Sequence, residues 1–138
     1  MGYVLEVTYK HGQGTRVLRT ASDIDAFVEE LLGAGPDYTS ATVYAIDEET
    51  DADPEHELVI GVDQQSGLGA VRYAGTDGEW FSQGESTNPD GVKFLYYGTA
   101  HDFPADSEVP LGIVRQALSE LLSVEGQRPE SVTWQPWA

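Results

Sequence analysis

The sequence contains no cysteine, which excludes a disulfide framework, a thiolate zinc site and a cysteine nucleophile. It also contains no run approaching ~18 consecutive apolar residues, the length that a membrane-spanning helix needs. Residues 1–6 lack the basic and apolar segments of a signal peptide. From these absences we expect a cytoplasmic protein that makes no contact with membranes.

Positive charge is scarce. The chain has 24 acidic residues against 7 Lys and Arg, a net charge of -17. Nucleic-acid affinity depends on a basic surface, so we expect no direct binding of nucleic acid. The same charge would speed the encounter with a basic protein, which we expect to be the partner. Acidity that serves only solubility is the alternative.

Motifs for catalysis and metal binding are missing as well. The three histidines, His11, His56 and His101, are far apart in the chain and form no His-Glu-x-x-His pattern. Neither a Gly-x-Ser-x-Gly elbow nor a phosphate-binding Gly-x-x-x-x-Gly-Lys loop occurs. We therefore predict a protein that is not an enzyme, with no catalytic residues, cofactor or metal. A small hydrolase using paired carboxylates is a weaker alternative.

Acidic residues are concentrated between residues 47 and 57, where seven of eleven side chains are carboxylates. An EF-hand loop needs a glutamate at its twelfth position, but counting from Asp47 or Asp51 that position is Leu58 or Val62. A calcium site, a solvated loop and a surface facing the partner are the three interpretations. The candidate partner-binding residues here are Asp47, Glu48, Glu49, Asp51, Asp53 and Glu55.

The hydrophobic pattern predicts an α+β fold. Ile24, Phe27, Val28, Leu31 and Leu32 have helical spacing after a cap at Thr20 or Ser22, and Gly33 ends this helix. A second helix starts near Pro110 and ends before Gly126. Alternation predicts strands at residues 3–9, 42–46, 57–62, 68–73, 79–82, 92–97 and 131–135. We expect residues 1–138 to form a single domain, an antiparallel meander of about five to seven strands with two helices packed on it.

The order of several short motifs from Leu58 onward resembles a known family. These motifs are Gly61-Val62-Asp63, Gly67-Leu68-Gly69-Ala70-Val71-Arg72-Tyr73, Phe81-Ser82-Gln83-Gly84, Tyr96-Tyr97-Gly98-Thr99-Ala100, Phe103-Pro104, Glu108-Val109-Pro110-Leu111, Gly126-Gln127-Arg128-Pro129 and Val132-Thr133-Trp134-Gln135. The set resembles the first family in the numbered immunity-protein series of bacterial polymorphic toxin systems, usually encoded beside toxins with a nucleic-acid deaminase domain. The resemblance implies an α+β protein that binds and neutralises one cognate toxin.

Tight inhibition needs aromatic or apolar anchors as well as charge, because charges at the rim of an interface mainly raise the association rate. Tyr96, Tyr97, Phe103 and Trp137 are the candidate anchors. We expect structural roles for the motif residues Asp63, Arg128, Pro129 and Trp134, with Arg128 pairing with a buried carboxylate such as Asp63 or covering an aromatic ring such as Trp134. The alternative function is an acidic nucleic-acid mimic that regulates another basic host protein.

Overall fold

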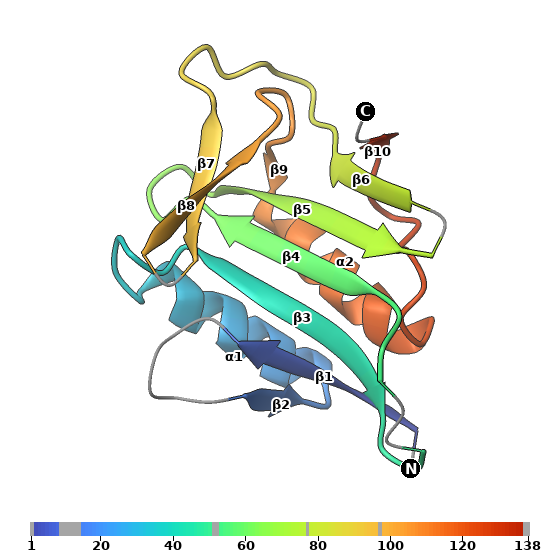
Figure 1. Ribbon diagram of the computed structural model, residues 1–138. Coiled ribbons are helices and arrows are strands. Elements are labelled where there is room, and N and C mark those ends of the chain that lie inside the picture. Colours follow the sequence, from blue (N-terminus) through green and yellow to red (C-terminus); the bar gives the residue numbers. More distant parts are fainter. Residues whose placement is uncertain (1, 9–14, 51–52, 77, 97, 137–138) are drawn as a thin grey trace.

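A computed structural model describes residues 2–8, 15–50, 53–76, 78–96 and 98–136. Its two helices and ten strands are drawn in Figure 1. In chain order they are β1 (Tyr3–Thr8), β2 (Arg16–Leu18), α1 (Ala21–Leu32), β3 (Ser40–Asp47), β4 (Glu57–Val62), β5 (Leu68–Gly75), β6 (Gly78–Ser82), β7 (Val92–Tyr96), β8 (Thr99–Phe103), β9 (Val109–Pro110), α2 (Leu111–Ser123) and β10 (Trp134–Pro136). The predicted α+β fold is confirmed.

One antiparallel sheet carries eight of these strands, in the order β10-β6-β5-β4-β3-β1-β2, with β9 beside the start of β5. Strands β3 to β6 form the predicted meander, in which each strand pairs with the next. The N-terminal β1 lies between β2 and β3, and pairs with β3 from Tyr3↔Asp47 to Thr8↔Thr42. The C-terminal strand returns to the sheet as predicted and pairs with β6.

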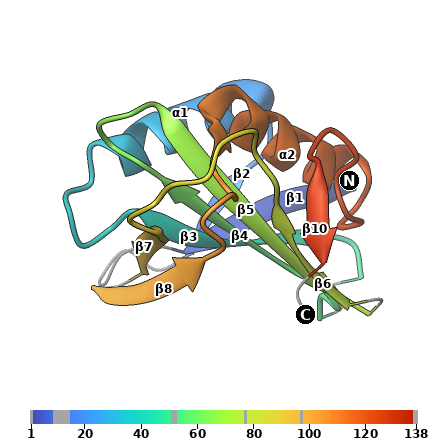
Figure 2. The same cartoon turned by 90° about the horizontal axis from the view of Figure 1, so that it is seen from above.

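Both helices cover the same face of the sheet, as Figure 2 shows. Helix α1 begins at a capping box, because Thr20 accepts a hydrogen bond from the Asp23 amide and Asp23 accepts one from the Thr20 amide. Its predicted stripe is buried at Ile24, Phe27, Val28 and Leu31, whereas Leu32 is half-buried. Helix α2 buries Leu111, Val114, Ala117, Leu118 and Leu121 against the same layer. The main core therefore lies between the helices and the sheet.

A separate hairpin, β7–β8, lies on the side of the sheet opposite the helices (Figure 2). The strand predicted at residues 92–97 is present as β7 over Val92–Tyr96, but it does not join the meander, because β10 occupies the outer side of β6. The apolar residues of the hairpin instead form a second cluster on the sheet, made by Ala70, Phe81, Val92, Phe94 and Phe103. The sequence did not predict β8, since four of its five residues are exposed and follow no apolar alternation.

The hairpin packs against the sheet at Gly61. A Cβ atom at this position would lie 2.3 Å from Cγ of Phe94, so only a glycine lets the ring lie directly on β4. The substitution Gly61→Ala should lower the free energy of unfolding by about 1–3 kcal/mol, the usual cost of overpacking.

Denaturant unfolding measures this effect, and Gly112→Ala is the matched control. Gly112 is the second residue of α2, nothing lies within 4 Å of a Cβ there and its φ is not positive, so the control should be about 0.4–1 kcal/mol more stable than the wild type. A Gly61→Ala protein as stable as the wild type would contradict this packing of the hairpin.

Candidate functional site

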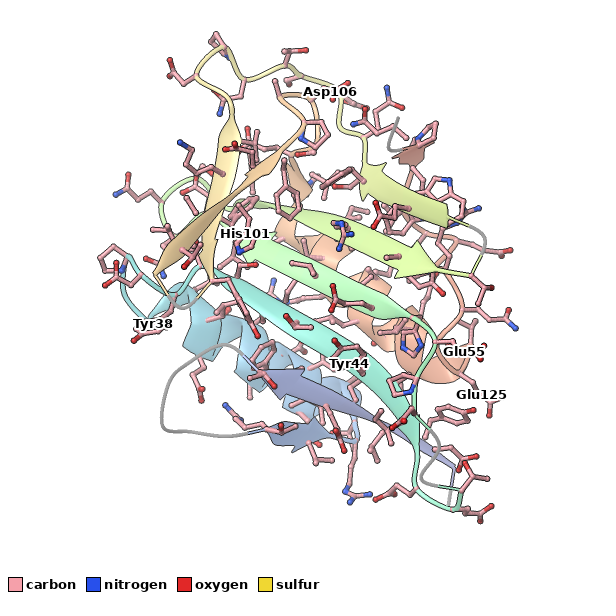
Figure 3. All side chains as sticks on the ribbon, viewed as in Figure 1. Tyr38, Tyr44, Glu55, His101, Asp106 and Glu125 are labelled. Carbon is pink, nitrogen blue, oxygen red and sulfur yellow. The ribbon has the colours of Figure 1, made fainter. Side chains whose placement is uncertain are left out.

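The candidate residues from the sequence lie in two separate places. The acidic loop after β3 is at one end of the sheet, near Glu55 and Glu125, whereas His101 of the hairpin lies toward the other end (Figure 3). Tyr96 and Phe103 belong to the hairpin. Asp51, Tyr97 and Trp137 lie outside the described residues. Two hollows correspond to these two places.

The larger hollow, here named the end cleft, has a volume of about 1010 Å³. It lies between the acidic β3–β4 connection and the α2–β10 connection, beside the outer ends of β5 and β6. Its described lining consists of Tyr3, Ala45, Asp47, Thr50, Asp53, Pro54, Glu55, His56, Tyr73, Gly75, Thr76, Trp80, Glu125, Gly126, Gln127, Arg128, Pro129, Glu130 and Trp134. Loops from two distant parts of the sequence thus form its two sides.

Aromatic rings make the floor of the end cleft. The Tyr73 ring stacks on His56, with 6.3 Å between ring centroids and 11° between ring planes, and it also contacts Trp80 and Trp134. Tyr73 Oη donates a 2.7 Å hydrogen bond to the carbonyl of Gly126. These contacts fix the α2–β10 connection against the sheet and hold the cleft in shape.

Arg128 also lines the end cleft. Its guanidinium lies 4.1 Å from the centre of the Trp80 ring, a cation–π contact. Of the two expected roles, Arg128 has the second, because it covers an aromatic ring, with Trp80 in place of Trp134. Asp63 instead accepts hydrogen bonds from the amides of Gln65 and Ser66 in the β4–β5 turn, and the bond from Gln65 is the main reason that the pKa of Asp63 is lowered.

The two other motif residues have structural positions. Trp134 donates a 2.7 Å hydrogen bond from Nε1 to the carbonyl of Pro129, which is buried. Together they set the path of the chain from the end of α2 to β10. The most recognisable part of the sequence motif therefore builds one side of the end cleft.

The end cleft is strongly acidic. Its described lining contains five carboxylates, Asp47, Asp53, Glu55, Glu125 and Glu130, against Arg128 alone, a formal balance of -4. His56 adds no positive charge near neutral pH, because burial lowers its pKa. Its Nε2 atom accepts a 2.9 Å hydrogen bond from the Ala45 amide, which also requires the unprotonated ring nitrogen.

Two other acidic residues of the loop that the structure describes, Glu48 and Glu49, do not line the end cleft. Glu48 binds the Arg19 guanidinium with both oxygens, at 2.7 and 2.9 Å, and this hydrogen bonding lowers the pKa of Glu48. Glu49 is exposed and is not part of the described lining. Of the five predicted loop residues that the structure describes, Asp47, Asp53 and Glu55 line the end cleft.

The second hollow, here named the sheet groove, has a volume of about 470 Å³. It lies between the hairpin and the open face of the sheet, and it is lined by Ser40, Thr42, Glu57, Val59, Arg72, Glu79, Phe81, Tyr96, His101, Asp102 and Phe103. Phe103 is only 7% exposed and packs edge-on against Phe81 and Phe94. Its ring fills the second core cluster, so packing accounts for this residue, and its role as an anchor for a partner stays a prediction.

A polar ladder crosses four strands beside the sheet groove. Tyr44 on β3 donates a 2.7 Å hydrogen bond to Glu57 on β4, and Arg72 on β5 bridges Glu57 and Glu79. Burial and the bond to Glu57 raise the pKa of Tyr44 to about 12, so its hydroxyl remains a donor at physiological pH. Tyr96 is half-buried and lies edge-on to His101, with ring centroids 6.2 Å apart.

Within the described part of the chain, no group of three or more His, Asp or Glu residues is placed to hold a metal ion. Neither described helix has the length and apolar character needed to cross a bilayer.

Comparison with known proteins decides the family. The family model described as immunity protein Imm1 matches residues 12–136. The chain belongs to the Imm1 family. This confirms the resemblance that the order of the sequence motifs indicated, and it makes a cognate toxin the partner of an Imm1 protein.

Other comparisons add little to the Imm1 assignment. A crystal structure of a hypothetical protein from Neisseria gonorrhoeae is similar at 14% sequence identity and a TM-score of 0.45, over 92% of this chain and 89% of that one. No curated protein matches the sequence significantly.

The aromatic and acidic residues that complete the end cleft of this Imm1 protein escaped the sequence analysis. No pattern in the sequence distinguishes Trp80 from a residue of the core or of a sheet face, and Glu125 and Glu130 follow a helix far from the acidic loop. The sequence held one usable signal, since both glutamates flank the Gly126–Pro129 motif that the family resemblance had already singled out.

His56 predicts a dependence of stability on pH. Its folded-state pKa is below the unfolded value of about 6.5, so the unfolded chain binds more protons in that window and stability falls as pH drops below about 6.5. Protonation would also break the bond from the Ala45 amide.

Thermal or denaturant unfolding at about pH 7.5 and about pH 5.5 measures the effect above the range where carboxylates titrate. The variant His56→Gln should lose less stability between the two pH values than the wild type does. Equal losses in both proteins would contradict the role assigned to His56, since His101 is present in both.

Proposed function

We propose that this immunity protein neutralises its toxin by placing the end cleft and the adjoining acidic loop against a basic substrate cleft. The observation that carries the proposal is the formal charge of -4 on the described lining of the end cleft. The partner is a toxin with a nucleic-acid deaminase domain, and the complex forms in the cytoplasm of the cell that makes both proteins.

The chemistry of nucleic-acid deamination supports this choice of partner. A deaminase must hold a polyanionic strand while a zinc-bound water attacks the base, so its substrate cleft needs basic side chains. Carboxylates such as Asp53 and Glu55 would satisfy the same basic side chains and exclude the substrate. Inhibition then follows from occupancy of the cleft and needs no reaction by the immunity protein.

Aromatic residues of the end cleft would supply the slow dissociation that charge alone does not give. Charges at the rim of an interface chiefly raise the association rate, whereas slow dissociation needs a desolvated centre, in which Trp, Tyr and Arg are enriched. Trp80 and Arg128 lie side by side within the end cleft. This pair is the proposed centre of the interface, and the carboxylates around it form the rim.

The direct test combines the purified protein with the toxin encoded beside its gene. We expect a stable complex and loss of deamination activity at equimolar ratio, measured on a single-stranded nucleic-acid substrate. Absence of a complex at micromolar concentrations would refute the proposal. If the toxin is inhibited but the nucleic-acid substrate does not compete with the immunity protein, only the proposed occlusion of the substrate cleft is refuted.

Charge reversal tests the end cleft specifically. Glu55 lines the cleft and Glu49 does not, although both are exposed residues of the same acidic loop. Glu55→Lys should slow association by roughly tenfold at low salt and reduce the salt dependence of the rate, because it reverses a steering charge. Glu49→Lys makes the same change in net charge and should have a much smaller effect. Equal effects of the two variants would show that only the overall charge matters.

A further inference from the structure

The hydrogen bonds of the β7–β8 hairpin determine which way the backbone of β8 faces. Leu95 on β7 donates its amide to Thr39 Oγ1 at 2.7 Å, and its carbonyl accepts the Thr39 amide at 2.9 Å. Both polar groups of Leu95 therefore point away from β8. Leu95 is paired with Ala100, so this pair is a non-hydrogen-bonded pair of the antiparallel ladder.

Alternation along the ladder then fixes the neighbouring residues. Thr99 and His101 direct their amides and carbonyls toward β7, whereas Ala100 and Asp102 direct theirs to the outer edge of β8. Among the described strands, β8 pairs with β7 alone. The outer edge of β8 thus offers the backbone donors and acceptors that an additional strand would use.

The sheet groove lies directly along this edge. Besides Tyr96, the hairpin lines it with His101, Asp102 and Phe103, all from β8. Its volume of about 470 Å³ is within the range of ligand-binding hollows in proteins. A strand added to β8 would therefore run over the open face of the sheet instead of projecting into solvent.

Charge indicates what kind of strand fits. The groove contains the carboxylates Glu57, Glu79 and Asp102 against Arg72, a formal balance of -2 without His101. The side chains of Glu57 and Glu79 are 38% and 40% exposed, so they can accept further hydrogen bonds while they hold Arg72. A second copy of this chain is a poor occupant, because each copy has a net charge of -17.

We propose that β8 accepts an extended, basic segment of the toxin as a third strand of the hairpin sheet. The segment would bond to the backbone of Ala100 and Asp102, and its alternate Lys or Arg side chains would reach Glu57 and Glu79. Backbone pairing would supply affinity and the carboxylates would supply selectivity. This inference rests on the proposed function for the identity of the partner, but it uses a surface separate from the end cleft.

Hydrogen exchange of the protein with and without the cognate toxin tests the proposal. The amides of Ala100 and Asp102 should become protected in the complex, and Ala100→Pro should weaken toxin binding by roughly tenfold. Proline at position 100 lacks the backbone N–H that would bond to the added strand, and this N–H makes no hydrogen bond within the hairpin. Ala100→Val keeps that amide at the same position and should bind like the wild type.

A second pair of variants tests the side-chain contacts. Glu79→Gln removes one groove carboxylate and should weaken binding several-fold, whereas Glu85→Gln, an exposed residue outside the groove, should not. If Ala100→Pro fails to fold, as judged by circular dichroism and melting, the exchange of the wild-type amides decides the matter.

The two proposals fail in different ways. A toxin complex that leaves the exchange of β8 unchanged would overturn the strand addition while leaving the immunity function in place. Protection of β8 that depends on the concentration of the immunity protein alone would identify a second copy as the occupant, and would also overturn it. Absence of any toxin complex would remove both proposals together.

Discussion

The contacts of Tyr73 are the constraint on which the candidate site depends. Its ring lies among His56, Trp80 and Trp134, and its hydroxyl binds the carbonyl of Gly126. One residue of β5 thereby joins both sides of the end cleft to the sheet. Rigid walls matter here because an interface that is already shaped loses less conformational entropy on binding. The cleft is thus a consequence of packing and does not depend on a bound partner for its shape.

The few basic residues explain why the acidic surfaces remain acidic. Arg16, Arg19, Arg72 and Arg115 each bind carboxylates within the chain, and Arg128 lies over Trp80. Exposed ion pairs of this kind add little stability, typically well under about 1 kcal/mol. Their larger effect is on the electrostatic field: Arg16 and Arg115 neutralise carboxylates of α1, Arg19 neutralises Glu48, and Arg72 partly offsets the carboxylates of the sheet groove. The carboxylates of the end cleft, by contrast, are opposed by one cation in the described lining.

Local patterns predicted the elements better than their arrangement. Helical spacing at Ile24, Phe27, Val28 and Leu31 requires one buried face, and the structure provides it. Alternation shows that Val92 and Phe94 need burial, but it does not show which surface buries them, so the position of the hairpin could not be predicted. The end cleft could not be predicted for a similar reason. Packing around Tyr73 brings Glu55 and Glu125 to the same hollow, and the spacing of residues in the sequence does not show this. Charge, which is visible in composition, indicates a basic partner but does not indicate where on the fold it binds.

The arrangement of the two hollows gives the sheet a role beyond support. The end cleft and the sheet groove lie at different places on one antiparallel sheet, so hydrogen-bonded strands hold their separation nearly constant. A partner that contacts both must match that separation, whereas a protein that is merely basic can satisfy one hollow at a time. Two contacts on a rigid support act together, because the first contact raises the effective concentration of the second. If the toxin contacts both surfaces as proposed, charge serves rapid encounter, while the fixed geometry between the two surfaces selects one toxin among many basic proteins.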